Sequence, residues 1–456
     1  MMRILRKGRV AGFAPAVTAL VIPIALQSLI SAAVNAADVV MLSSVGQQAL
    51  AAVSVAGQVT FTLQLFYMGM AGGLTVLASQ YYGKGDEGAV ERALGIAAGL
   101  SSLVSLVFFL GALLTPAPLL RVFTSDPALV ELGTGYLRAL APSYMMTGLS
   151  QMYLCVLKSV KRPGLSAAVS ASCLLINIAL NALSIFVLFP GDPARAVVAV
   201  AVSTSAARLA ELVWCLWHSA RRGRVRLRLG AMLRPDRALF GDYARCTAPM
   251  QANYLIWGCA LAATAAIMGH VSTDMVAANA VASTVRNLAI VLCNGVAGAS
   301  ILVGQYLGEG KLAEARRAGR YLCLCSLVFG ALAGISILLA RPWVVSVARL
   351  NKTAGGYLGG MLYVCALYCI GKSFNSTVVG GIFCAGADTR FGLVLDAVVM
   401  WGVILPLGGL CAFMLRLPPV ALYAVFCLDE FIKLPAVIVH YRRYRWLKNI
   451  TREESV

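Results

Sequence analysis

The sequence predicts an all-α membrane protein with twelve transmembrane helices in two pseudo-symmetric six-helix lobes. Three observations predict this class: 60% of the 456 residues are apolar and only 12% are charged, the apolar residues gather in long runs, and one segment recurs later in the chain. A soluble chain of this length carries about a quarter charged residues. The mean hydropathy of +0.81 therefore indicates that lipid supplies much of the solvent.

The net charge of +19 is confined to short loops between the apolar runs. Cationic loops beside apolar spans are typical of membrane proteins, so we expect the lipid bilayer as a partner and no nucleic acid. The 13 cysteines lie mostly inside apolar runs, without a CxxC pair or a nearby histidine. We therefore expect neither a resident cofactor or metal centre nor an enzyme active site.

A helix needs about 20 apolar residues to cross the hydrocarbon layer. The first apolar run follows four basic residues, as in a signal peptide, but it extends from about Phe13 to Leu42 and is too long for one. We interpret it as the first span. The twelve predicted spans cover residues 12–40, 50–78, 93–115, 136–157, 164–189, 196–217, 246–268, 276–304, 320–340, 355–384, 392–413 and 418–440.

The lysines and arginines predict the orientation. Most of the 38 fall in segments on one side of the membrane if both termini are cytoplasmic. The richest segment joins the sixth and seventh spans and is the longest hydrophilic stretch. We therefore predict an N-lobe over residues 1–220, a cytoplasmic linker over 221–245 and a C-lobe over 246–456, in the inner or plasma membrane.

An internal repeat supports two lobes. The segment LASQYYGKGDEGAVERALG (77–95) resembles LVGQYLGEGKLAEARRAGR (302–320), with Gln80 and Gly83 falling on Gln305 and Gly308. Six spans per lobe give both copies the same orientation. Parallel repeats of this kind are a transporter architecture in which the substrate path lies between the halves, whereas duplication of an inert bundle is the structural alternative.

Polar side chains in the first span share one face. Gln27, Ser31, Asn35 and Asp38 follow one another at spacings of four, four and three residues. Asp38 is the one carboxylate in the first five spans of this sequence. Because an unpaired charge is costly in the membrane, Asp38 is expected to bind a cation or to take up a proton.

The fifth and sixth spans supply further oxygen atoms. Asn177 and Asn181 lie one turn apart, and Thr204 lies in the sixth span. Amide and hydroxyl oxygens beside one carboxylate suit an alkali ion, although each Asn can equally form an interhelical hydrogen bond. Arg208 and Glu211 are interpreted as a mutually neutralising pair.

The second half of the chain carries more intramembrane charges. Lys433 follows Asp429 by four residues and Glu430 by three, which predicts an internal ion pair. Asp396 has no partner nearby in sequence, so it is a second candidate for ion handling or substrate contact, with a structural role as the alternative. The sequence gives no partner for Arg286 or Lys372. No Walker loop is present, so we expect an ion gradient to supply the energy.

The chain resembles the multidrug and toxic compound extrusion (MATE) family over nearly its whole length. The resemblance is carried by PIALQSLISAAVNAADVVML with ALAAVSVAG, by SQYYGKGD, by YLR (136–138), by LINIALN (175–181), and by VVGGIFCAGADTRF (378–391). It implies two six-helix lobes around a central cavity, and export of organic, often cationic, compounds in exchange for Na⁺ or H⁺.

The resemblance also implies a cation site in the N-lobe. The positions that match it are Asp38, Asn177, Asn181 and Thr204, the residues already grouped by helical spacing. One branch of the family has a Glu in the seventh span and an Asp in the tenth. This sequence has Tyr254 or Trp257 and Asn375 there, so a C-lobe cation site of that type is not implied.

We therefore predict a monomeric secondary antiporter that exports organic, cationic or amphipathic compounds in exchange for Na⁺ or H⁺. Gln27, Ser31, Asn35 and Asp396 are candidate substrate-contacting residues. The nearest alternative is a flippase for lipid-linked precursors, which would carry more cationic residues toward its cavity. A membrane enzyme or a channel is the alternative from another class, but an enzyme needs a cluster of His, Asp and Glu that the sequence does not contain.

Overall fold

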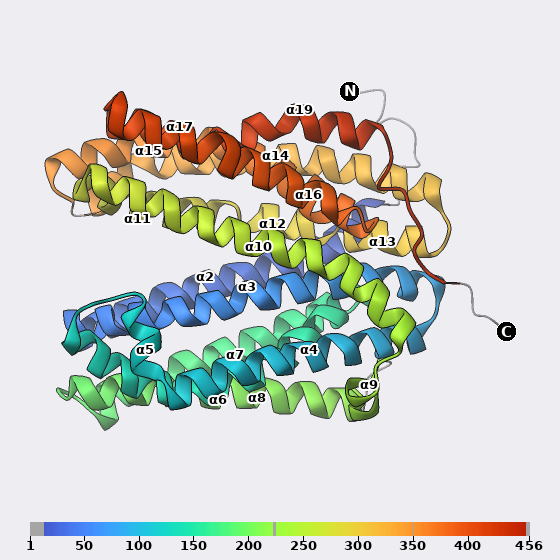
Figure 1. Ribbon diagram of the computed structural model, residues 1–456, viewed down its shortest axis with the longest axis horizontal. Coiled ribbons are helices and arrows are strands. Elements are labelled where there is room, and N and C mark those ends of the chain that lie inside the picture. The colour runs from blue at the N-terminus through green and yellow to red at the C-terminus, as the bar shows by residue number, and fades with distance from the viewer. Residues whose placement is uncertain (1–12, 222–224, 349, 453–456) are drawn as a thin grey trace. The chain divides into compact units, whose positions relative to one another are not determined.

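The structure, a computed structural model, describes residues 13–221, 225–348 and 350–452. These residues form helices joined by short turns, and none of them lies in a β-strand (Figure 1). The helices of the first half are α2 (Phe13–Val45), α3 (Gln47–Lys84), α4 (Glu87–Leu114), α5 (Pro116–Arg121), α6 (Pro127–Ser159), α7 (Pro163–Leu183), the π-helix η1 (Ser184–Leu188), α8 (Pro193–Arg221) and α9 (Leu229–Leu233).

The second half continues in the same way. Its elements are α10 (Arg237–Val271), α11 (Thr273–Ala289), α12 (Val291–Gly298), α13 (Ile301–Gly308), α14 (Leu312–Val347), α15 (Lys352–Asn375), η2 (Ser376–Phe383), α16 (Thr389–Asp396), η3 (Ala397–Ile404), α17 (Leu405–Gly409), η4 (Leu410–Met414), α18 (Pro419–Phe426) and α19 (Asp429–Arg442). The all-α class predicted from the apolar runs is confirmed.

Local sequence signals begin several of these helices. The side chain of Asp86 accepts a hydrogen bond from the backbone N–H of Ala89 at 2.7 Å, and Asp126 caps α6 ahead of a proline at its first position. Asn351 caps α15 by accepting from Ala354 N at 2.7 Å. Such caps satisfy backbone donors that the first helical turn leaves without partners.

Ten helical segments of the described chain are long and apolar enough to cross a bilayer. The predicted fourth span corresponds to α6, which carries the charged residues Glu131, Arg138 and Lys158. The predicted twelfth corresponds to the shorter helices α18 and α19 together. With these two segments the helices account for the twelve predicted spans.

The eighth span differs from the prediction of one helix over 276–304. The chain there forms α11, α12 and α13, with breaks at Ile290 and at Ala299–Ser300. The middle piece packs very closely on α2: a Cβ added at Gly295 would lie 2.8 Å from the Val21 carbonyl oxygen. The glycines allow this close approach at the expense of helix regularity.

By their internal contacts the residues fall into two compact units. The first unit holds the described residues up to Ser28, the short segment Ser79–Gly85, and those from Ala248 onward. The second holds Leu29–Ala78 and the described part of Asp86–Thr247. The helix α2 therefore contributes residues to both units. The predicted division into 1–220, 221–245 and 246–456 stays a prediction.

The predicted hydrophilic linker packs within the second unit. The Nε atom of Arg228 lies 2.9 Å from Oε2 of Glu91 on α4, and the backbone N–H of Arg226 donates to Oε1 of the same carboxylate at 2.8 Å. The short helix α9 lies against α4 so closely that a Cβ at Gly95 would meet Ala231 at 2.5 Å. This part of the linker is therefore anchored to α4 rather than held in solvent.

The two copies of the repeated motif contact each other within the first unit. A Cβ added at Gly83 would lie 2.1 Å from the carbonyl oxygen of Gln305, and one at Gly308 would lie 1.8 Å from the carbonyl oxygen of Gln80. Each copy thus presents a glycine to the backbone of the other copy's glutamine. The repeat predicted from the sequence marks a reciprocal backbone contact.

Candidate ion-coupling site

The polar residues of the second unit converge on Asp38 of α2. The Nδ2 atom of Asn181 on α7 donates to Oδ1 of Asp38 at 2.9 Å. The same Nδ2 atom also donates to Oδ1 of Asn177, one helical turn away, at 3.3 Å. A single amide group therefore links the carboxylate to the neighbouring amide.

The chain of hydrogen bonds continues to α8. Nδ2 of Asn177 donates to Oγ1 of Thr204 at 3.1 Å, and the Thr204 hydroxyl donates to the carbonyl oxygen of Val200 at 3.0 Å. Beside this link, the hydroxyls of Ser184 and Ser203 lie 3.0 Å apart. Three helices thus bring together the four residues Asp38, Asn177, Asn181 and Thr204.

The site contains a buried oxygen without a hydrogen-bond donor. Asn177 is 7% exposed and Asn181 is 1% exposed, and Oδ1 of Asn181 has no hydrogen-bond partner in the structure. In the part of the chain that the structure describes, no lysine or arginine forms an ion pair with Asp38, which is half-buried. Because a buried acceptor without a donor is costly, a proton donor or a small cation at this oxygen would stabilise the site.

The donor set fits a hard ion. One carboxylate, two amide groups and a hydroxyl offer oxygen atoms of the kind that alkali and alkaline-earth cations prefer. The described residues contain no group of three or more His, Cys, Asp or Glu that could hold a metal ion. A carboxylate can bind a proton, and this set of oxygen atoms can coordinate a hard cation.

The other residues on the polar face of the first span are distributed along α2. Gln27 is half-buried and belongs to the part of α2 in the first unit, whereas Ser31, also half-buried, belongs to the second unit with Asp38. Asn35 lies in the same helix, and its side chain lies outside the described residues. The substrate-contact role predicted for these residues stays a prediction.

A second polar pair in this unit is neutralised internally. Nη1 of Arg208 lies 2.6 Å from Oε2 of Glu211, whose side chain is fully buried. The interpretation of these residues as a mutual ion pair is confirmed. A charged pair of this kind holds no net charge for an ion from solution to balance.

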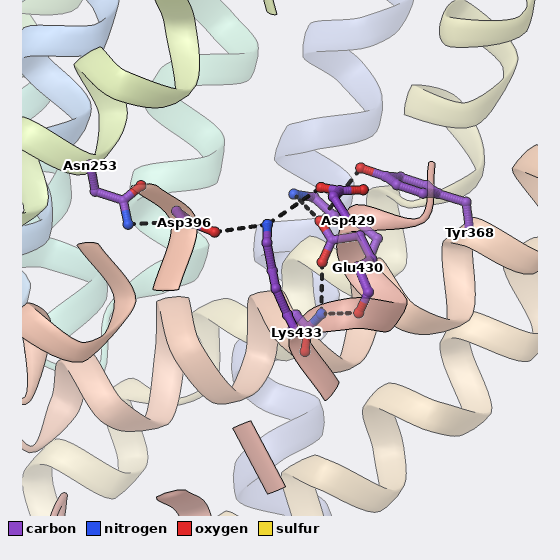
Figure 2. A network of polar contacts seen from close by, with 8 residues as sticks. Asn253, Tyr368, Asp396, Asp429, Glu430 and Lys433 are labelled. Atoms are coloured by element: carbon purple, nitrogen blue, oxygen red, sulfur yellow. Dashed lines mark hydrogen bonds and ion pairs between the residues drawn. The ribbon is translucent and has the colours of Figure 1, made fainter. Parts of the chain in front are cut away.

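The first unit contains a larger network, shown in Figure 2. Nζ of Lys433 lies 2.7 Å from Oδ1 of Asp396 and 3.3 Å from Oδ2 of Asp429, so the lysine bridges α16 and α19. Nδ2 of Asn253 on α10 donates to the other oxygen of Asp396 at 3.0 Å. Asp396 thus has partners that lie far away in sequence, and its predicted role in ion handling or substrate contact stays a prediction.

Glu430 forms the other half of this network. Its Oε1 accepts from Nζ of Lys372 at 3.0 Å, and its Oε2 accepts from Nδ2 of Asn375 at 2.8 Å. The ion pair predicted between Lys433 and Asp429 is confirmed. The predicted pairing of Lys433 with Glu430 is replaced by Lys372, because a residue on α15 reaches the carboxylate across the helix interface.

Arg286, the remaining isolated cation, contacts aromatic residues. Its Nη1 donates to the hydroxyl of Tyr423 at 3.3 Å, and its guanidinium lies 5.1 Å from the centre of the Tyr368 ring. The Tyr368 hydroxyl in turn donates to Oε1 of Glu430 at 3.5 Å. Sequence reasoning missed these links, although polar residues inside apolar runs were the signal that pointed to the region.

Two of the π-helical segments follow these polar clusters. The segment η1 begins at Ser184, one turn after Asn181, and η3 begins at Ala397, directly after Asp396. Such wider turns interrupt the regular backbone hydrogen bonding and occur frequently at functional sites. They are a feature that periodicity in the sequence did not reveal.

Taken together, the paired repeats, the membrane-crossing helices and the intramembrane charges define a polytopic membrane transporter. The MatE family model matches residues 23–183 and again residues 249–409, so it covers both halves of the chain. The chain belongs to the MatE family, whose members are transporters and not enzymes.

Curated relatives align over almost the whole chain. The "Uncharacterized transporter YisQ" of Bacillus subtilis (strain 168) is 23% identical over 414 residues, covering 90% of this chain and 89% of its own. The "Probable multidrug resistance protein NorM" of Bradyrhizobium diazoefficiens is 25% identical over 439 residues, covering 93% and 92%. The similarity is distant but continuous from end to end.

Solved structures show the same fold. One is described as "Reverse polarity of binding pocket suggests different function of a MOP superfamily transporter from Pyrococcus furiosus Vc1 (DSM3638)", with a TM-score of 0.85 at 18% identity, covering 94% of this chain and 95% of that chain. Another, described as "Outward-facing conformation of a multidrug resistance MATE family transporter of the MOP superfamily.", has a TM-score of 0.83 at 18% identity, with coverage of 94% and 95%. The predicted membership and the predicted twelve-helix, two-lobe architecture are therefore confirmed.

Proposed function

We propose that the protein is a secondary antiporter that exports organic, cationic or amphipathic compounds in exchange for H⁺ or Na⁺. The carrying observation is the hydrogen-bonded set Asp38, Asn181, Asn177 and Thr204, in which a buried amide oxygen lacks a donor. The printed name of one relative supports the substrate class, because the protein of Bradyrhizobium diazoefficiens is called a probable multidrug resistance protein.

The coupling step is binding of the ion at Asp38. A proton would neutralise the carboxylate, whereas Na⁺ would be held by its oxygen together with amide and hydroxyl oxygens. The ion is transported cargo, so it need not remain bound through the cycle. Either ion removes the cost of a charged acid that has no cationic partner in the described chain.

The helix α2 provides a route from ion binding to conformational change. It carries Asp38 in the second unit, and its residues up to Ser28 belong to the first unit. Pro23 lies inside this helix and removes one backbone hydrogen bond, which makes bending at that level easier. We propose that neutralising Asp38 bends or shifts α2 and thereby changes the affinity for substrate.

We also propose that the chain lies in the plasma membrane as a monomer with both termini cytoplasmic. The distribution of lysine and arginine over the loops supports this orientation. The flippase alternative is not favoured, because the compared relatives are named as transporters and multidrug resistance proteins.

The test is efflux of an organic cation from proteoliposomes under separately imposed Na⁺ and pH gradients. The wild-type protein is expected to respond to at least one gradient, and Asp38→Asn is expected to lose the response. The matched control is Asp192→Asn, which neutralises an exposed carboxylate of the same unit that pairs with exposed Arg195. Undiminished gradient-driven efflux by Asp38→Asn would remove this acid from the mechanism.

A further inference from the structure

A basic surface lies where α14 begins and α19 ends, within the first unit. Its members are the exposed residues Arg316, Arg317, Arg320, Arg442, Arg443, Arg445 and Lys448. These residues come from the first turns of α14, from the last residue of α19 and from the stretch that follows α19, which is drawn in red in Figure 1. A concentration of positive charge of this kind attracts phosphate-bearing ligands.

Tyr444 holds two of these arginines in place. The guanidinium of Arg316 lies 3.9 Å from the centre of the Tyr444 ring. Burial raises the pKa of Tyr444, but hydrogen bonds and positive charge from Arg316 and Arg320 together outweigh burial, so the pKa lies below its ordinary value. The tyrosine adopts a φ of 53°, a left-handed conformation that an L-residue adopts only when its surroundings favour it. The turn at Tyr444 therefore places its side chain beside both guanidinium groups.

These two arginines differ from their neighbour on the same helix. Arg317 lies 3.5 Å from Oε1 of Glu314 and is thus neutralised by a carboxylate. Within the described residues, neither Arg316 nor Arg320 forms an ion pair with an acid. Two guanidinium groups fixed beside one tyrosine, and not balanced by a carboxylate, can both donate to one phosphate.

The position along α14 indicates the source of the phosphate. Arg320 directly precedes residues 321–340, a run of twenty without any charged side chain. A run of this length crosses the hydrocarbon layer, so Arg320 lies near its boundary, at the level of the headgroups. Trp446, which stacks on Tyr441 at 5.5 Å, packs against Gly319 directly before Arg320, so the stretch after α19 is held beside this boundary.

We propose that Arg316 and Arg320, positioned by Tyr444, bind the phosphate of an anionic phospholipid headgroup. This site is distinct from the ion-coupling site and does not depend on the transported compound. Its ligand is a lipid of the surrounding membrane with a net negative headgroup, such as phosphatidylglycerol.

Lipid binding at this point would also stabilise the C-terminal strap, residues 443–452. From Tyr444 the strap runs to the repeated motif and contacts Gln80 there. Nε2 of Gln80 donates to the carbonyl oxygen of Lys448 at 3.1 Å, and the backbone N–H of Ile450 donates to Oε1 of Gln80 at 2.9 Å. Trp446 is fully buried between these contacts. A bound headgroup that fixes Tyr444 therefore favours the docked strap.

The experiment measures lipid binding to the purified full-length protein. Native mass spectrometry from detergent gives the apparent Kd for phosphatidylglycerol and for phosphatidylcholine, and inorganic phosphate serves as competitor. The variant Arg316→Gln/Arg320→Gln removes both proposed ligands, and Arg317→Gln on the same helical turn is the matched control. Tyr444→Phe keeps the ring and removes the hydroxyl.

We expect the double variant to bind phosphatidylglycerol about thirty-fold more weakly, since each basic residue near an anionic surface contributes roughly a fivefold factor in affinity. Arg317→Gln should change the affinity less than about twofold, because its charge is already balanced. Binding to phosphatidylcholine should be weaker than to phosphatidylglycerol and the same in all variants.

An equal loss of affinity for phosphatidylglycerol in Arg317→Gln and in the double variant would overturn the proposal, because net charge alone would then explain the binding. Displacement of the lipid by inorganic phosphate at equal concentration would overturn the assignment to a lipid. A melting temperature for the double variant that matches the wild type in phosphatidylcholine, and is lower only in phosphatidylglycerol, would support the site and show that the variant folds.

Discussion

The contact between the two repeat copies leaves no room for a side chain at Gly308. A Cβ there would lie 1.8 Å from the carbonyl oxygen of Gln80, whereas ordinary contacts lie between 3.4 and 4 Å. The obstacle is backbone, so no rotamer change relieves it, and the segments must separate by roughly 1.5 Å in a close-packed interior. Gly308→Ala is therefore expected to destabilise the first unit by about 3 kcal/mol, the upper end of the cost of overpacking.

The consequence extends to the hydrogen bonds of Gln80. Its Nε2 also donates to the carbonyl oxygen of Ala385 at 2.7 Å, so displacing this segment disturbs partners at three points of the unit. The assay is the melting temperature of the purified protein in detergent, followed by intrinsic fluorescence. We expect Gly308→Ala to lower the Tm by about 3 °C or more.

The matched control is Gly269→Ala. Gly269 lies in α10 with nothing within 4 Å of an added Cβ, so alanine should leave the Tm unchanged or slightly higher. A Gly308→Ala protein that melts together with the Gly269→Ala protein would refute the reasoning from close backbone contact.

Two further predictions concern buried polar groups. Lys433→Met leaves Asp396 and Asp429 without their shared cation and should lower the free energy of unfolding by about 3–5 kcal/mol, measured by thermal unfolding. Adding Asp396→Asn and Asp429→Asn to this variant should restore most of that stability. Failure of the rescue would contradict the pairing. Asn181→Leu removes the hydrogen-bond donor to Asp38. This variant should lose gradient-driven efflux, while its Tm changes little. Normal coupling of efflux to the ion gradient in this variant would count against the proposed site.

Much of the fold could be predicted, because lipid imposes a simple rule. Long apolar runs must form helices in a bilayer. The cationic loops then predict the orientation of these helices, and the repeat predicts their division into two lobes. The broken eighth span could not be foreseen, since residues 276–304 read as one apolar run. Its interruption depends on how closely the glycines of α12 approach Val21 of α2, a contact between segments far apart in the chain.

The same distinction applies to the polar residues. Asn177 and Asn181 could be grouped from their spacing alone, because both lie on one face of one helix. The partners of Lys372 and Asp396 could not, since Glu430 follows Lys372 by 58 residues and Asn253 precedes Asp396 by 143. Local periodicity carries no information about which helix lies opposite.

Ion release on substrate binding tests the central claim most directly. Antiport at Asp38 requires that substrate binding lowers the affinity for the coupling ion, by the same factor as the ion lowers the affinity for substrate. Titrating an organic cation into weakly buffered detergent-solubilised protein, with pH and Na⁺ recorded, should release H⁺ or Na⁺ in the wild type and none in Asp38→Asn. Equal release from both proteins would contradict the account.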